Sequence, residues 1–181
     1  MVALVGAGLS AAAMGYTMIG LELALLLGFQ AVHGYVYHQL AAIIAAFMAG
    51  MAIGSWLSVR AGGLGARALA AVQALIGLSP LTVCAALFSH PAPLAFPLLA
   101  LFCGAAGGFQ FPLASRVYFR ASGARPAAIG TPYALDLAGS CLGALVFSAW
   151  LIPVFGFWNT AVLAALLNLP AVLLTALASR N

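Results

Sequence analysis

The chain has only two acidic side chains, Glu22 and Asp136, and both stand within long apolar runs. An ionisable group inside a membrane span marks an ion or proton site, or else belongs to a buried ion pair. Asp136 is expected at the depth of Arg116, which predicts an ion pair or a cytoplasmic gate. Glu22 has no basic residue in its half of the span. It must therefore be protonated, bind a cation, or contact a histidine or a partner subunit, so it is the candidate cation or proton site. The alternative is a neutral acid hydrogen-bonded to Tyr16 or to a backbone carbonyl.

These two acids are not expected to form a catalytic pair. At a rise of 1.5 Å per residue, the predicted spans place Glu22 and Asp136 about 18 Å apart along the membrane normal. A shared proton or a bridging metal is excluded at that separation. The sequence also has no P-loop, haem-attachment motif, catalytic triad or metal motif. We therefore expect a chain without catalytic residues, metal or cofactor.

Two pairs of glycines have the spacing of helix contacts in membranes. Gly50 and Gly54 form one small-x-x-x-small pair, and Gly139 and Gly143 form a second. Residues four apart lie on one helix face, where a glycine lets a neighbouring backbone approach closely. Both pairs therefore predict helix packing, either within the chain or between subunits.

A third pattern combines a proline with glycines and an amide. Gly108, Gln110 and Pro112 stand close together in one apolar run. A proline inside a helix removes one backbone hydrogen bond, so a kink is expected here. The freed carbonyl and the Gln110 amide would then line a polar cavity; the alternative is a static kink held by packing.

The composition requires a membrane around these residues. Of 181 residues, 66% are hydrophobic and 4% are charged, and the mean hydropathy is +1.18. A soluble surface needs far more charge, and scattered arginines cannot form a nucleic-acid groove. Continuous apolar runs of about 20 residues indicate helices rather than barrel strands. We predict a single all-α integral membrane domain, residues 1–181, with six transmembrane helices at about 4–28, 37–59, 68–89, 94–117, 132–152 and 157–178.

The basic residues predict the orientation of these helices. The six basic residues are all arginines, and they follow or flank alternate spans: Arg60, Arg67, Arg116, Arg120, Arg125 and Arg180. The other connections contain no basic residue. The positive-inside rule therefore places both termini on the cytoplasmic side of the inner membrane. His33, His38 and His90 then fall on the opposite side, where they are either interfacial residues or ligands of a metal or haem.

Four motifs, the last of them in two parts, together resemble a known family. They are Gly15-x6-Glu22, residues 49–56 (AGMAIGSW), 108–113 (GFQFPL), 133–144 (YALDLAGSCLGA) and 152–156 (IPVFG). This set resembles the membrane domain of spermidine synthase-like proteins, which join a transporter-like helical region to an aminopropyltransferase-like domain. Relatives commonly carry Arg five positions after the first-helix acid, where this chain has Leu27. The soluble domain would follow the sixth helix, but this sequence stops at Asn181, so no aminopropyl transfer is assigned to it.

Three functions remain open. The first is a non-catalytic integral subunit or anchor of a larger inner-membrane assembly, with lipid, other subunits or a second copy as partners and no nucleic acid. The second is a half-transporter for a polyamine or other organic cation that dimerises around a midplane cavity. The two helices that carry the glycine pairs, the second and the fifth, are the middle members of two successive triplets of helices. This correspondence favours a 3+3 inverted repeat, the internal symmetry of half of a major-facilitator-type transporter. The third, a membrane redox subunit, rests on His33, His38 and His90 alone.

Overall fold

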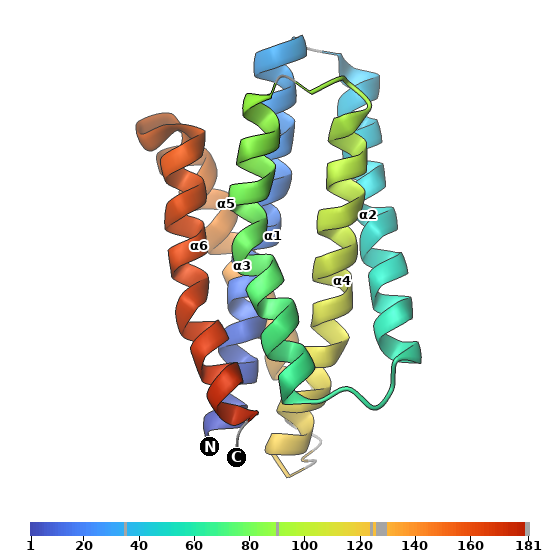
Figure 1. Cartoon of the computed structure of the whole chain (residues 1–181), viewed down its shortest axis with the longest axis vertical. Helices are drawn as coiled ribbons and strands as arrows, with labels where there is room; N and C mark the ends of the chain where they lie inside the picture. The colour runs from blue at the N-terminus through green and yellow to red at the C-terminus, as the bar shows by residue number, and fades with distance from the viewer. Residues whose placement is uncertain (35, 90, 124, 126–129, 180–181) are drawn as a thin grey trace.

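The structure is a computed structural model that describes residues 1–34, 36–89, 91–123, 125 and 130–179. It is a bundle of long helices without strands in those residues (Figure 1). The elements are α1 (Val2–His33), α2 (Tyr37–Arg60), α3 (Ala66–Phe88), α4 (Ala95–Ala121), α5 (Thr131–Val146), a π-helical segment (Phe147–Leu151) and α6 (Ile152–Ala178). Each helix bonds its own backbone polar groups, as a hydrocarbon environment requires.

Length and apolar character make these helices suitable for crossing a membrane. Within the described residues, α1 to α4 and the stretch Thr131–Ala178 are the five helical segments that meet both conditions. The prediction of an all-helical, multi-pass membrane protein is therefore confirmed. Four of the six predicted spans correspond to α1 to α4, although α1 begins two residues before its predicted span, 4–28, and ends five residues after it.

The last two predicted spans are not separate helical segments. Helical structure continues from Thr131 through the π-helical segment to Ala178, and the backbone leaves helical angles inside it at Gly156, with φ 71° and ψ 175°. A positive φ is strained for a residue with a Cβ, so a glycine permits the reversal at this point. Figure 1 shows the chain folding back at the upper end of α5, after which α6 descends beside α3. The predicted connection at 153–157 is therefore not a loop between two helices; the chain turns at Gly156 within continuous helical structure.

Glycines bring α2 and α4 into backbone contact. A Cβ on Gly50 would overlap the carbonyl oxygen of Leu101, and one on Gly54 would overlap that of Ala105. The contact is reciprocal, because added Cβ atoms on Gly104 and Gly108 of α4 would overlap carbonyl oxygens of α2. The first of the two glycine pairs therefore packs within the chain.

The second glycine pair joins α5 to α1. A Cβ on Gly139 would overlap the carbonyl oxygen of Ala12, and one on Gly143 would lie 2.6 Å from that of Tyr16. The bundle therefore contains two tightly packed helix pairs, α2 with α4 and α1 with α5. The space between these pairs holds the candidate site.

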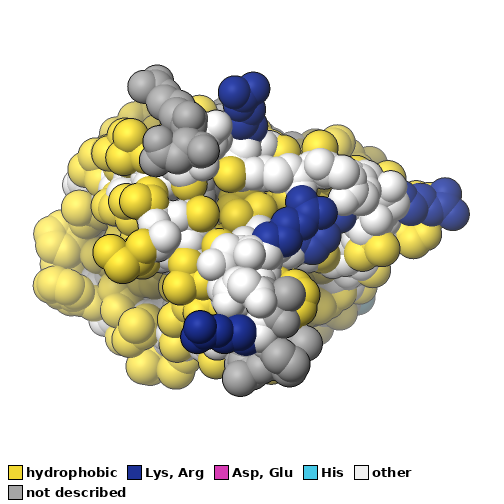
Figure 2. Space-filling model, turned by 90° about the horizontal axis from the view of Figure 1, so that it is seen from below, with side chains coloured by type: hydrophobic (Ala, Val, Ile, Leu, Met, Phe, Trp, Pro, Cys, Tyr) yellow, Lys and Arg dark blue, Asp and Glu magenta, His cyan; other side chains and the backbone are white. Residues whose placement is uncertain are grey.

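The described arginines gather at one end of the bundle. Arg60 ends α2, Arg67 lies in the first turn of α3, Arg116 and Arg120 lie near the end of α4, and Arg125 follows α4. Figure 1 places the two chain ends at this same end of the molecule, and Figure 2 shows the arginine side chains on that face. Arg180 lies outside the described residues.

Candidate functional site

A cavity of about 280 Å³ lies between the two glycine-packed helix pairs. Helices α1, α2, α4 and α5 all contribute to its wall. Its polar side chains are those of Glu22, Ser55, Tyr133, Asp136 and Ser140. Both acids of the chain therefore face one cavity inside the hydrophobic part of the protein.

The two acids are closer along the bundle than the predicted 18 Å. Asp136 lies against Gly15 of α1, where an added Cβ would be 2.5 Å from its carboxylate Oδ1. Glu22 stands seven residues after Gly15 on α1, which is two helical turns or about 10 Å. The prediction of two separate sites is wrong, because the close packing of α5 on α1 sets Asp136 level with Gly15.

The two acids differ in accessibility, and neither has a basic partner in the described residues. Glu22 is 7% exposed, whereas Asp136 is half-buried. The predicted ion pair between Asp136 and Arg116 is not formed. Arg116 instead donates from Nη2 to the carbonyl oxygen of Ser58 at 2.6 Å and to its Oγ at 3.0 Å. Arg116 is directed at the last turns of α2, whereas Asp136 is directed at α1, so the two charges belong to different helix contacts.

This geometry predicts that Asp136 and Arg116 contribute independently to stability. In a double-mutant cycle of Asp136→Asn and Arg116→Gln, the coupling energy should stay within about 0.5 kcal/mol, as for residues without shared partners. Arg116→Gln and Ser58→Ala should instead couple by about 0.5 kcal/mol or more, because they share a hydrogen bond. The measurement is the free energy of unfolding in detergent micelles. Rescue of Asp136→Asn by Arg116→Gln would show that the two side chains pair after all.

Gln110 does not line the cavity, so the prediction that its amide lines a polar cavity is wrong. Its side chain is fully buried, and its Nε2 donates to the backbone oxygen of Ser10 at 3.2 Å, to Ser10 Oγ at 3.0 Å and to Gln73 Oε1. Helix α4 continues past Pro112 to Ala121. The cavity wall on α4 comes from Gly108 and its neighbours, and Ser55 Oγ donates to the Gly108 carbonyl oxygen at 3.0 Å.

Gln110 belongs to a polar network that sequence reasoning missed. Gln73 Nε2 donates to Asn168 Oδ1 at 2.7 Å, and Asn168 Nδ2 donates to Thr17 Oγ1 at 2.8 Å. With Ser10, these side chains connect α1, α3, α4 and α6, and all are buried. Uncharged polar residues buried in separate apolar helices hydrogen-bond across the interfaces. The available signal was the occurrence of uncharged polar residues within each of these four apolar helices.

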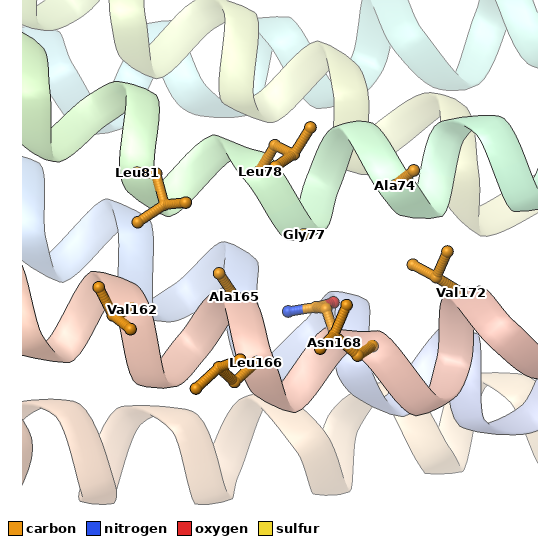
Figure 3. A pocket seen from close by; sticks show the side chains of 10 residues that line it. Ala74, Gly77, Leu78, Leu81, Val162, Ala165, Leu166, Asn168 and Val172 are labelled. Carbon is orange, nitrogen blue, oxygen red and sulfur yellow. The ribbon is translucent and has the colours of Figure 1, made fainter.

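A larger cavity, of about 370 Å³, lies between α3 and α6 (Figure 3). Its wall is formed by aliphatic side chains and Gly77, apart from Asn168, whose amide is already bonded within the network. It contains no ionisable group and offers no chemistry. The cavity between α1, α2, α4 and α5 is therefore the candidate functional site.

The two histidines that the structure describes, His33 and His38, do not line the candidate site. His33 Nε2 lies 3.1 Å from the carbonyl oxygen of Pro91, and its ring packs against Phe29 and Phe96. His38 lies in the first turn of α2 and lines a separate cavity with residues of the connection before α4 and of its first turn, and His90 lies outside the described residues. Nowhere in the described part of the chain do three His, Cys, Asp or Glu side chains come together as a metal site.

Comparison with known proteins leaves the family undecided. No family model, curated protein or solved structure matches the chain. The resemblance to the spermidine synthase-like membrane domain therefore stays a prediction, and the function must be argued from the cavity itself.

Proposed function

We propose that this chain is a non-catalytic half-transporter that carries a cation or a proton through the cavity between α1, α2, α4 and α5. The observation that supports this is the position of Glu22 and Asp136, the only acids of the chain, on one cavity without a basic partner in the described residues. A carboxylate in hydrocarbon needs a proton or a cation to offset its charge. An acid-lined cavity that lacks internal counter-charges is suited to binding such an ion.

The packing of the bundle supports a 3+3 inverted repeat. The two glycine-packed pairs have the same contact register: each of the four contact residues in the second half stands 89 positions after its counterpart in the first half. The corresponding residues are Gly50 and Gly139, Gly54 and Gly143, Ala12 and Leu101, and Tyr16 and Ala105. Counterparts lie in helices of opposite direction, because α1 and α4, like α2 and α5, run oppositely in Figure 1. Inverted repeats with a site at the interface between them are typical of secondary transporters. In this arrangement α5 and α6 each cross the membrane once, so the chain crosses the membrane six times.

The cavity supports assembly with a second copy. Two of the residues in its wall are largely exposed, Met48 at 54% and Tyr133 at 56%, so the cavity reaches the surface of the single chain. A cavity opening that makes two acidic side chains accessible to lipid is energetically unfavourable. A second copy placed face to face would cover it and enclose a midplane cavity. A subunit of different sequence would also cover it, and that arrangement is the anchor function.

We also propose that the arginine-bearing end lies in the cytoplasm and that the membrane is the inner membrane, because basic residues are retained on the cytoplasmic side. An impermeant thiol reagent added to intact cells should fail to label Gly63→Cys, in the exposed connection between α2 and α3. Labelling from outside would invert the orientation.

Cross-linking in the membrane tests the assembly. In a cysteine-free background (Cys84→Ala, Cys103→Ala, Cys141→Ser), Ile44→Cys and Leu137→Cys should form dimers with a short thiol cross-linker. Both positions are exposed, and each is one helical turn from a residue in the cavity mouth, Met48 or Tyr133. Leu173→Cys, exposed on α6, is the matched control and should remain monomeric. Cross-linking of the cavity-side positions to a chain of another sequence would favour the anchor function, and equal cross-linking at all three positions would contradict the dimer.

A further inference from the structure

The methionines of this chain are concentrated at the candidate site. There are five in the sequence, and the four that follow Met1 all line the cavity: Met14, Met18, Met48 and Met51. The first two lie one turn apart on α1, and the other two lie on α2. Methionine is a common filler of irregular apolar gaps. Gap filling does not explain why all four share one cavity with the only two acids.

Two of the sulfur atoms converge on a single point of the wall. A Cβ placed on Gly107 of α4 would lie 2.9 Å from the Sδ of Met18 and 3.6 Å from the Sδ of Met14. Both methionine side chains are buried. The absence of a side chain at Gly107 thus provides the space in which the two thioethers approach each other, and Met51 lies on the facing helix, α2.

The donor set determines which cations this cavity would prefer. Thioether sulfur is a soft, uncharged ligand that selects Cu(I) among biological metal ions, whereas magnesium, calcium and manganese prefer oxygen ligands. We propose that the cavity binds a soft monovalent metal ion, Cu(I), through Met14, Met18 and Met51, with the two acids of the same wall, Glu22 and Asp136, together offsetting its positive charge. This inference rests on the proposed function and names the ion for the same site. No electron transfer is involved, since the ion enters and leaves as Cu(I).

The test uses the full chain in detergent or in nanodiscs, with Ag(I) as a redox-inert probe and Cu(I) under reducing conditions. Competition with a chromogenic Cu(I) chelator measures the affinity. Met14→Leu/Met18→Leu nearly conserves side-chain volume and removes both converging sulfurs. It should weaken binding by about 10-fold or more, because even the loss of an outer partner of a metal ligand costs 10–100-fold. The cysteine-free variant is the matched control and should bind as tightly as the native chain, since it removes only thiols.

A second measurement tests the metal site without replacing any of the methionines by leucine. In selenomethionine-labelled native protein, X-ray absorption at the selenium edge should show a metal neighbour after Cu(I) or Ag(I) is added. The proposal is overturned if no selenium–metal contact appears, if the double leucine variant binds normally, or if binding disappears in the cysteine-free variant.

Transport separates this inference from the proposed function. Uptake of Cu(I) into proteoliposomes should fall in Met14→Leu/Met18→Leu and in Glu22→Gln. An organic amine carried equally well by the native chain and the double leucine variant, with loss only in Glu22→Gln, would overturn the metal inference and leave the half-transporter standing. Methionine-dependent metal binding without uptake would instead refute the half-transporter and retain the metal site.

Discussion

Glu22→Gln and Asp136→Asn should each abolish cation uptake by the reconstituted protein while leaving it folded. Both substitutions keep the shape and hydrogen-bonding capacity of the side chain and remove its charge. Two opposite charges about 4 Å apart attract by about 4 kcal/mol at an effective dielectric constant near 20. At about 1.4 kcal/mol per tenfold, loss of that attraction corresponds to a fall in uptake on the order of 1,000-fold. The measurement is the initial rate of uptake into proteoliposomes, with folding checked by gel filtration.

Thr82→Val provides a matched control for these variants. Thr82 is exposed on α3, and its hydroxyl donates to the Ser79 carbonyl oxygen of its own helix, at 2.9 Å. Its replacement removes a polar group from a span away from the cavity, so uptake should be unchanged. Normal uptake in both acid variants would refute the ion-binding role of the two carboxylates. Loss of dimer cross-links in Glu22→Gln would assign that residue to the subunit interface instead.

Gly54→Ala should remove most of the folded protein. The added methyl carbon would overlap the carbonyl oxygen of Ala105 and lie 2.8 Å from the backbone nitrogen of Phe109, so only a shift of one whole helix can make room for it. Overpacking typically costs 1–3 kcal/mol where side chains can move, and a backbone obstacle places this substitution at about 3 kcal/mol or above. The measurement is the melting temperature and the folded yield in detergent.

Gly63→Ala is the control for this substitution. Gly63 lies in the connection after α2, and an added Cβ there would meet nothing within 4 Å. Its melting temperature should match that of the native chain. A Gly54→Ala variant as stable as Gly63→Ala would show that α2 and α4 are farther apart than described. The same comparison with Gly139→Ala would test the contact between α5 and α1.

The sequence by itself determined the properties that depend on local composition. Continuous apolar runs established an all-helical membrane protein and located α1 to α4, because burial of backbone polar groups in hydrocarbon leaves few alternatives. The positions of the arginines along the chain also placed them at one end of the bundle, since helices joined by short connections alternate in direction. Gly50 and Gly139 were identified as packing residues from spacing alone.

Only the tertiary structure decided which faces meet. These helices are apolar on nearly all sides, so hydrophobic periodicity does not define the rotation of each helix about its axis. For this reason the sequence placed Arg116 beside Asp136, whereas packing directs Arg116 to Ser58. Packing also buries Gln110 in a network with Ser10 and Gln73 and sets Asp136 level with Gly15. The shared cavity of the two acids and the four methionines is therefore a product of helix rotation and pairing, which a one-dimensional pattern of apolar residues does not encode.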